Sequence, residues 1–178
     1  TGGYQNQLEK KKPYLANYVY DPQVRPTGTI LTSTGRLASY FQSGRSEDGL
    51  FGVDFLRYSK VYQKGSLKIR HQLQVGFATI INQNIKRGID IRGVNGIVGF
   101  SPDSLVGTKR LVLSQEAVIY SKSKVLGFRL APLARVDMAL LDTNPKFFSG
   151  ENFFSGFSLG IRARNENLIF NTLEARVY

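Results

Sequence analysis

The stretch Ser66–Ile81 reads SLKIRHQLQVGFATII and decides the fold class. Apolar side chains dominate its odd-numbered positions, starting at Leu67, and polar or small side chains occupy the even-numbered positions up to Ala78. Successive side chains of a β-strand point to opposite faces, so this alternation predicts a strand with one apolar and one polar face. The stretch is also much longer than the about 5–6 residues of an ordinary globular strand.

The period of two recurs towards the C-terminus. Val125–Thr143 carries apolar side chains at its even positions and places Arg129 and Asp137 together at odd positions. The last alternating segment sets Glu174 and Arg176 against apolar neighbours. No amphipathic helix interrupts these segments, so we predict an all-β, antiparallel meander. The seven expected strands span residues 28–43, 50–63, 66–82, 105–121, 125–142, 154–164 and 167–178.

Composition narrows the class of protein. The chain has 178 residues, 42% of them hydrophobic, a formal net charge of +11, one histidine (His71) and no cysteine. That rules out a disordered chain, a disulfide framework and a thiolate metal site. Residues 1–26 are polar and rich in Gly, Lys and Pro, and we expect a connecting loop there with one short strand at 14–20. The alternating domain would then span residues 27–178. The chain begins at Thr1 without a signal peptide, so we interpret it as a mature or internal segment of a larger protein.

Strand length and connection length both favour a membrane β-barrel. A tilted strand needs about 9–11 residues to cross a bilayer, and several expected strands reach that length. The expected connections alternate between short turns and longer loops, as in outer-membrane barrels, which have tight periplasmic turns and long external loops. The short turns are 63–66, 121–124 and 165–167, and the long loops are 43–49, 82–104 and 142–153.

The positive charges fall on the polar faces of the expected strands. Each would cost about 2–4 kcal/mol if it faced lipid at the bilayer midplane, but little in a wet lumen. We therefore predict a basic lumen, an apolar outer wall in contact with membrane lipids or lipopolysaccharide, and no nucleic-acid partner. The residues of the predicted basic lumen are Lys68, Arg70, Arg110, Arg129, Arg135, Arg162 and Arg164.

A short motif inside the longest loop (82–104) carries a family resemblance. The residues Ile91-Arg92-Gly93-Val94 resemble the Val/Ile-Arg-Gly-Phe/Tyr motif of the outer-membrane assembly-factor and surface-antigen superfamily, with valine in place of the aromatic residue. This superfamily includes BamA-type insertases and the transporters of two-partner secretion. Segments around Glu116 and Asp137 also resemble the strands that follow the motif in the family.

The resemblance implies a fold, a location and an activity. The fold would be the C-terminal half of a transmembrane β-barrel of about 16 strands in the outer membrane of a Gram-negative bacterium. The activity would be membrane protein assembly or protein translocation, with outer-membrane or secreted proteins as clients. In the family the loop arginine locks the loop to acidic groups of the barrel wall, so Arg92 and Gly93 would be held by Asp137 or Glu116.

Other functions remain open from the sequence alone. The chain could be a passive, anion-favouring pore or a structural subunit of a larger envelope complex, or it could carry an enzymatic domain that lies outside this segment. A soluble basic protein that binds nucleic acid fits less well, because the charges alternate with apolar residues. Gly156–Gly160 matches the hydrolase pattern G-x-S-x-G, but that pattern needs a strand–turn–helix elbow and a later histidine. We therefore expect no catalytic residues, no metal and no cofactor.

Overall fold

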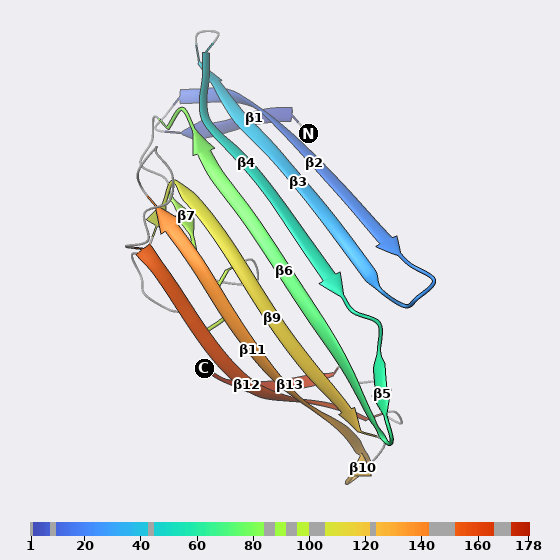
Figure 1. The fold of residues 1–178 in the computed structure, drawn as a ribbon. Coiled ribbons are helices and arrows are strands. Elements are labelled where there is room, and N and C mark those ends of the chain that lie inside the picture. The colour runs from blue at the N-terminus through green and yellow to red at the C-terminus, as the bar shows by residue number, and fades with distance from the viewer. Residues whose placement is uncertain are drawn as a thin grey trace.

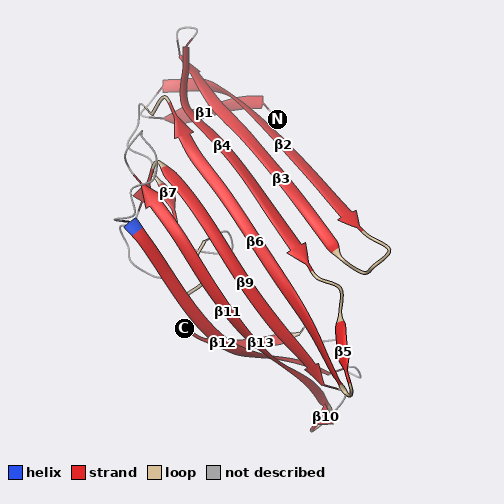
Figure 2. Cartoon of the chain, in the orientation of Figure 1, coloured by secondary structure: helices blue, strands red, loops and turns tan. Residues whose placement is uncertain are grey.

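A computed structural model describes most of the chain, and nearly all of the described residues lie in β-strands (Figure 2). The described ranges are 2–7, 10–42, 45–83, 88–91, 96–99, 106–121, 124–142, 152–165 and 172–178. The strands of the large sheet are β1 (Gly2–Gln7), β2 (Lys10–Val24), β3 (Ile30–Gln42), β4 (Arg45–Tyr58), β5 (Tyr62–Lys64), β6 (Leu67–Ile81), β9 (Lys109–Ser121), β10 (Lys124–Val125), β11 (Phe128–Asp142), β12 (Phe153–Asn165) and β13 (Leu173–Val177). A second, two-stranded sheet joins β7 (Ile89–Asp90) to β8 (Val106–Gly107).

The large sheet is an antiparallel meander, which confirms the predicted all-β fold class (Figure 1). Its strand order is β1-β2-β3-β4-β6-β9-β11-β12-β13, with β5 added to β6 and β10 added to β11. Neighbouring strands of this sheet follow one another along the chain, and every pairing is antiparallel. Within the described residues β1 and β13 each pair on one side only, so the sheet is open and does not close into a barrel.

The structure differs from the sequence-based expectation in three connecting regions. Residues 1–26, expected as a loop with one short strand, hold β1 and β2. β2 pairs with β3 from Tyr14 to Val24. The expected long loop at 43–49 is shorter, because β4 begins at Arg45. The expected tight turn at 165–167 is longer, because β13 begins only at Leu173. The alternation of connection lengths therefore holds only between β4 and β12.

The predicted alternation is visible in the burial of β11. Leu133 and Ala139 are buried on one face, whereas Val136 and Met138 are exposed on the other. Hydrogen-bonded register carries each face across the sheet, since directly paired residues point to the same side. We define the inner face as the side that carries Glu116 and the outer face as the opposite side. From β4 to β12 the outer face is mostly apolar and exposed, whereas the inner face carries charged side chains together with two buried apolar clusters.

One hairpin has a backbone geometry that its sequence only half suits. Val125 pairs with Phe128, so Leu126 and Gly127 form a two-residue turn, and both have positive φ, 49° and 81°. Two positive φ angles in a row are typical of the type I′ turn that matches the twist of a hairpin. Glycine adopts this conformation freely, but leucine rarely does. Leu126 is also 93% exposed, so this apolar side chain lies at the tip of a turn.

The sheet bends sharply between β12 and β13, whose ends turn out of line with the other strands (Figure 1). Gly160 on β12 allows this close approach: a Cβ placed there would lie 2.7 Å from the carbonyl oxygen of Ala175 and 2.9 Å from Cγ of Arg176. Distances that short are excluded for a real side chain. The glycine therefore lets β13 fold towards the inner face, where its charged side chains reach β9.

Candidate functional site

The inner face collects the charged residues that the sequence placed on polar faces. Arg135 pairs with Glu116, which pairs in turn with Gln72, so β11, β9 and β6 present these side chains to one side. The predicted residues that lie on this face are Lys68, Arg70, Arg110, Glu116, Arg129, Arg135, Asp137, Arg162 and Arg164. Arg92 and Gly93 lie outside the described residues, so their predicted role stays a prediction.

Ile91, the first residue of the motif, and Ile97, which follows the motif, pack onto the inner face. Ile91 and Ile97 are buried to 0% and 1% exposure and form a cluster with Val112, Ala139 and Leu141 from β9 and β11. The backbone N–H of Ile97 donates to the carbonyl oxygen of Ile91 at 2.7 Å. Burying two isoleucines contributes about 1.5–3 kcal/mol for each side chain. Ile91 and Ile97 thus place two points of the 82–104 loop against the sheet.

Two charged residues of the wall hold this loop through its backbone. The carboxylate of Asp137 accepts from Nε of Arg135 at 2.8 Å and, through its other oxygen, from the backbone N–H of Val98 at 3.4 Å. Arg110 donates from Nη1 to the carbonyl oxygen of Asp90 at 2.6 Å. Asp137, Arg135 and Arg110 are all buried. The wall therefore satisfies loop backbone groups with charge-assisted hydrogen bonds, which are stronger than neutral ones.

Among the described residues, Glu116 is the centre of a four-membered ion-pair network on the inner face. Its carboxylate is only 2% exposed and accepts from Nη2 of Arg162 at 2.7 Å and from Nη2 of Arg176 at 2.8 Å, one arginine for each oxygen. Both arginines also pair with Glu174 on β13. Two carboxylates and two guanidinium groups alternate, so the four charges balance. The network ties β13 to β9 across two intervening strands.

The sequence predicts the faces of this network but not its contacts. Glu116, Arg162 and Arg176 lie on polar faces that were expected to line a lumen, and Glu174 lies on the polar side of the last strand without a predicted role. The available signal was their shared parity and opposite charge. A flat sheet would keep β9 and β13 about 14 Å apart, at about 4.8 Å between neighbouring strands, so alternation alone does not indicate the contact.

A second inner-face pair was not predicted at all. Arg36 on β3 donates from Nη2 to Asp54 on β4, and both side chains are partly buried. The segments that contain Arg36 and Asp54 alternate less regularly than Ser66–Ile81. The sequence pattern therefore did not indicate that the two side chains lie on the same face. The pair shows that opposite charges are matched near the N-terminal half of the inner face as well.

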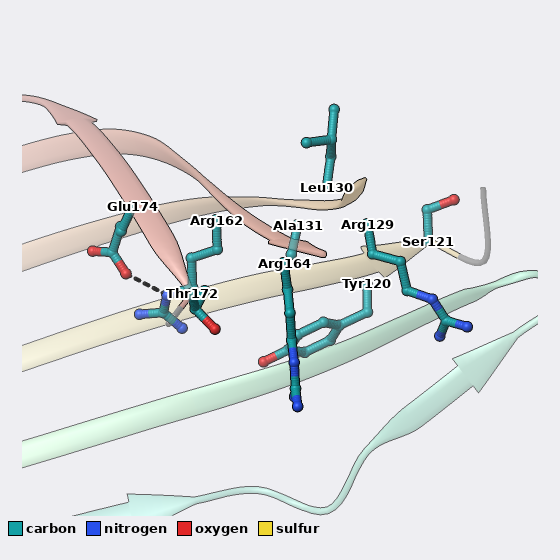
Figure 3. Close-up of a pocket in the computed structure, with 9 residues that line it drawn as sticks. All are labelled: Tyr120, Ser121, Arg129, Leu130, Ala131, Arg162, Arg164, Thr172 and Glu174. Carbon is teal, nitrogen blue, oxygen red and sulfur yellow. Dashed lines mark hydrogen bonds and ion pairs between the residues drawn. The ribbon is translucent and has the colours of Figure 1, made fainter. Parts of the chain in front are cut away.

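A basic pocket opens at the short-turn end of the inner face, with a volume of about 530 Å³ (Figure 3). Arg129 and Arg164 stand directly opposite each other on β11 and β12, and Arg162 lies beside them. Like charges that lie directly opposite each other on neighbouring strands repel. Figure 3 shows the side chains of Arg129, Arg164 and Tyr120 projecting to the same side of the sheet. The remaining lining residues are Ser121, Leu130, Ala131, Thr172 and Glu174.

The described residues contain no group of three or more His, Asp or Glu side chains placed to hold a metal ion. In the part of the chain that the structure describes, no helix is both long and apolar enough to cross a membrane.

Comparison with known proteins found no matching family model, no matching curated protein and no matching solved structure.

Proposed function

We propose that this chain forms part of the wall of a β-barrel in the bacterial outer membrane. The observation that carries the proposal is the contrast between the two faces of one open sheet. The inner face holds buried ion pairs, whereas the outer face exposes large apolar side chains such as Phe157 and Leu159, at 58% and 54%. Soluble monomers rarely expose contiguous apolar surface on this scale.

The dimensions of the strands support the same proposal. Strands β2, β6 and β11 each have 15 residues and β4 has 14, more than the about 9–11 needed to cross a bilayer. The outer face of β4 presents Phe51, Val53 and Phe55 in succession. The open edges at β1 and β13 would then pair with further strands, since an unpaired edge in hydrocarbon leaves backbone groups unsatisfied.

Assistance in inserting or translocating other proteins is the activity we propose for the barrel. It rests on the resemblance of the Ile91–Val94 motif, together with the packing of Ile91 and Ile97 onto the inner face. A loop held inside the barrel by Asp137 and Arg110 would set the state of the lumen through which, or beside which, a client passes.

The variant Arg92→Ala tests this activity in the full-length protein. We expect it to slow the folding of a client barrel into vesicles by roughly tenfold, because a charge-assisted contact of about 1.5–3 kcal/mol is lost, while the barrel itself still forms. The control is Arg129→Ala, which removes an inner-face arginine away from the loop. Equal client folding rates for Arg92→Ala and the unaltered protein, at equal amounts of inserted protein, would remove the mechanism.

The basic pocket favours a second candidate function, a passive pore that prefers anions. Planar-bilayer recordings under a salt gradient would measure this preference as a reversal potential. The double variant Arg129→Gln/Arg164→Gln is expected to shift the reversal potential towards zero, the value of a pore without ion preference. The reason is that two positive charges are removed from the lumen wall. Arg57→Gln, on the outer face, should leave it unchanged. A protein without conductance would rule out the pore.

A further inference from the structure

The outer face of β4 changes character at its last outward residue. Phe51, Val53 and Phe55 are followed on the same face by Arg57, which is exposed. Among the described residues no carboxylate lies within ion-pair distance of Arg57. An arginine on a lipid-facing wall costs about 2–4 kcal/mol at the bilayer midplane but about 0–1 kcal/mol near the interface. If the sheet crosses a membrane, Arg57 therefore marks a level close to the boundary between hydrocarbon and water.

A β-bulge beside Arg57 forms a recess in this face. Tyr58 at the end of β4 pairs with Gln72, and Tyr62 at the start of β5 pairs with Ile69. The three residues 59–61 therefore lie opposite only two residues of β6, 70 and 71. The bulge is held by Ser59, whose backbone N–H donates to the carbonyl oxygen of His71 at 2.8 Å and whose Oγ accepts from the backbone N–H of His71 at 3.0 Å. Bulges redirect side chains and are common at functional positions. The recess has a volume of about 290 Å³.

The lining of the recess suits an oxyanion that is attached to an apolar group. The lining residues are Arg57, Ser59, Tyr62, His71, Leu73 and Gln115, none of them acidic. Nε2 of Gln115 lies 3.3 Å from Nδ1 of His71, and the ammonium group of Lys60 lies 5.3 Å from the centre of the Tyr62 ring. A guanidinium group offers a planar fork of donors that matches phosphate oxygens. Beside it, Leu73 and the neighbouring Phe55 offer apolar contact for an acyl chain.

We propose that this recess binds the phosphate of an anionic phospholipid headgroup, with Arg57 as the principal ligand and Lys60 as a second positive charge. The proposal rests on the membrane placement proposed above and adds a specific lipid site to it. A lipid fits both the cationic recess and the apolar surface beside it, because its phosphate binds the cations while its acyl chains cover the apolar outer face of β4. A free phosphate would fit only the cationic recess.

The experiment uses the protein inserted into phosphatidylcholine vesicles that contain one part in ten of phosphatidylglycerol, then extracted in a mild detergent for native mass spectrometry. The unaltered protein is expected to retain phosphatidylglycerol in preference to phosphatidylcholine. Arg57→Gln should lower that retention by roughly tenfold, the effect of losing one charge-assisted contact. Arg57→Lys, which keeps the charge and loses the fork, should fall between the two. Arg164→Gln, which removes an arginine from the inner face, should retain as much lipid as the unaltered protein.

The outcomes separate this site from the proposed membrane placement. Normal insertion with equal phosphatidylglycerol retention in the Arg57→Gln and unaltered proteins would overturn the lipid site alone. Displacement of the lipid by millimolar inorganic phosphate would overturn it too, since the recess would then bind phosphate without regard to the acyl chains. A chain that stays folded in buffer and inserts into no vesicle would overturn both proposals.

Discussion

Replacing Leu159 by arginine is expected to destabilise the protein in a bilayer, lowering its free energy of unfolding by about 2–4 kcal/mol. The cost arises because a charge on the lipid face near the midplane must be removed from water. Leu159 lies in the middle of β12 on the outer face and is 54% exposed. On a surface that faces water, the same substitution would change stability by no more than about 0.5 kcal/mol. The two environments therefore give clearly different results for one variant.

The measurement is the urea midpoint of the protein folded into vesicles. Leu126→Arg is the matched control, because it makes the same chemical change at the 93% exposed tip of the β10–β11 turn, where no strand meets lipid. Leucine and arginine also tolerate the positive φ of that position about equally. If Leu159→Arg and Leu126→Arg show the same midpoint as the unaltered protein, the outer face does not contact hydrocarbon and the membrane proposal is lost.

The second large effect is expected at Glu116, whose carboxylate holds Arg162 and Arg176. Removing one member of a buried ion pair costs about 3–5 kcal/mol, because the remaining charge is left without compensation. Glu174 still contacts both arginines, and their side chains are 26% and 12% exposed. We therefore expect Glu116→Gln to cost a smaller amount, about 2–3 kcal/mol, read as a lower urea midpoint.

A double variant shows whether the loss comes from unbalanced charge. Glu116→Gln/Arg176→Gln removes one positive charge together with the negative one and should recover part of the lost stability, as a coupled pair does in a double-mutant cycle. Gln115→Ala changes the neighbouring side chain on the opposite face and should be close to neutral. A Glu116→Gln protein as stable as the Gln115→Ala protein would show that the network contributes nothing to holding β13.

The regular strands could be predicted from sequence because their two faces meet different surroundings. Ser66–Ile81 and Val125–Thr143 alternate clearly, and β6 and β11 begin and end within a few residues of those segments. Only residues 14–20 of β2 were predicted as a strand, because polar residues lie on both of its faces: Asn17 and Asp21 point outwards, while Tyr18 and Tyr20 point inwards. Its conformation depends on its hydrogen-bonded partner β3 and not on a hydrophobic pattern.

The candidate site was predictable as a set of residues but not as a set of contacts. Parity placed Glu116, Asp137 and the predicted arginines on one face, and the register of the strands agrees. Which arginine reaches Glu116 depends on how far β13 bends inwards, and that bend depends on the space left by Gly160. An alternation with a period of two carries no information about curvature, so the pairing of Arg176 with Glu116 depends on the bend of the sheet and not on the sequence pattern.

The meander also determines how costly each pairing is to establish during folding. Most neighbouring strands are joined by short connections, so their hairpins close small loops at a low entropic cost. β6 and β9 have the longest connection, since the 82–108 segment separates them. Local pairings form fastest, so β1–β6 and β9–β13 would assemble as two separate hairpin arrays and join last along the β6–β9 seam. Ile91 and Ile97 pack against β9 and β11, so docking of this loop before the β6–β9 pairing would shorten the chain that is left to close at that step.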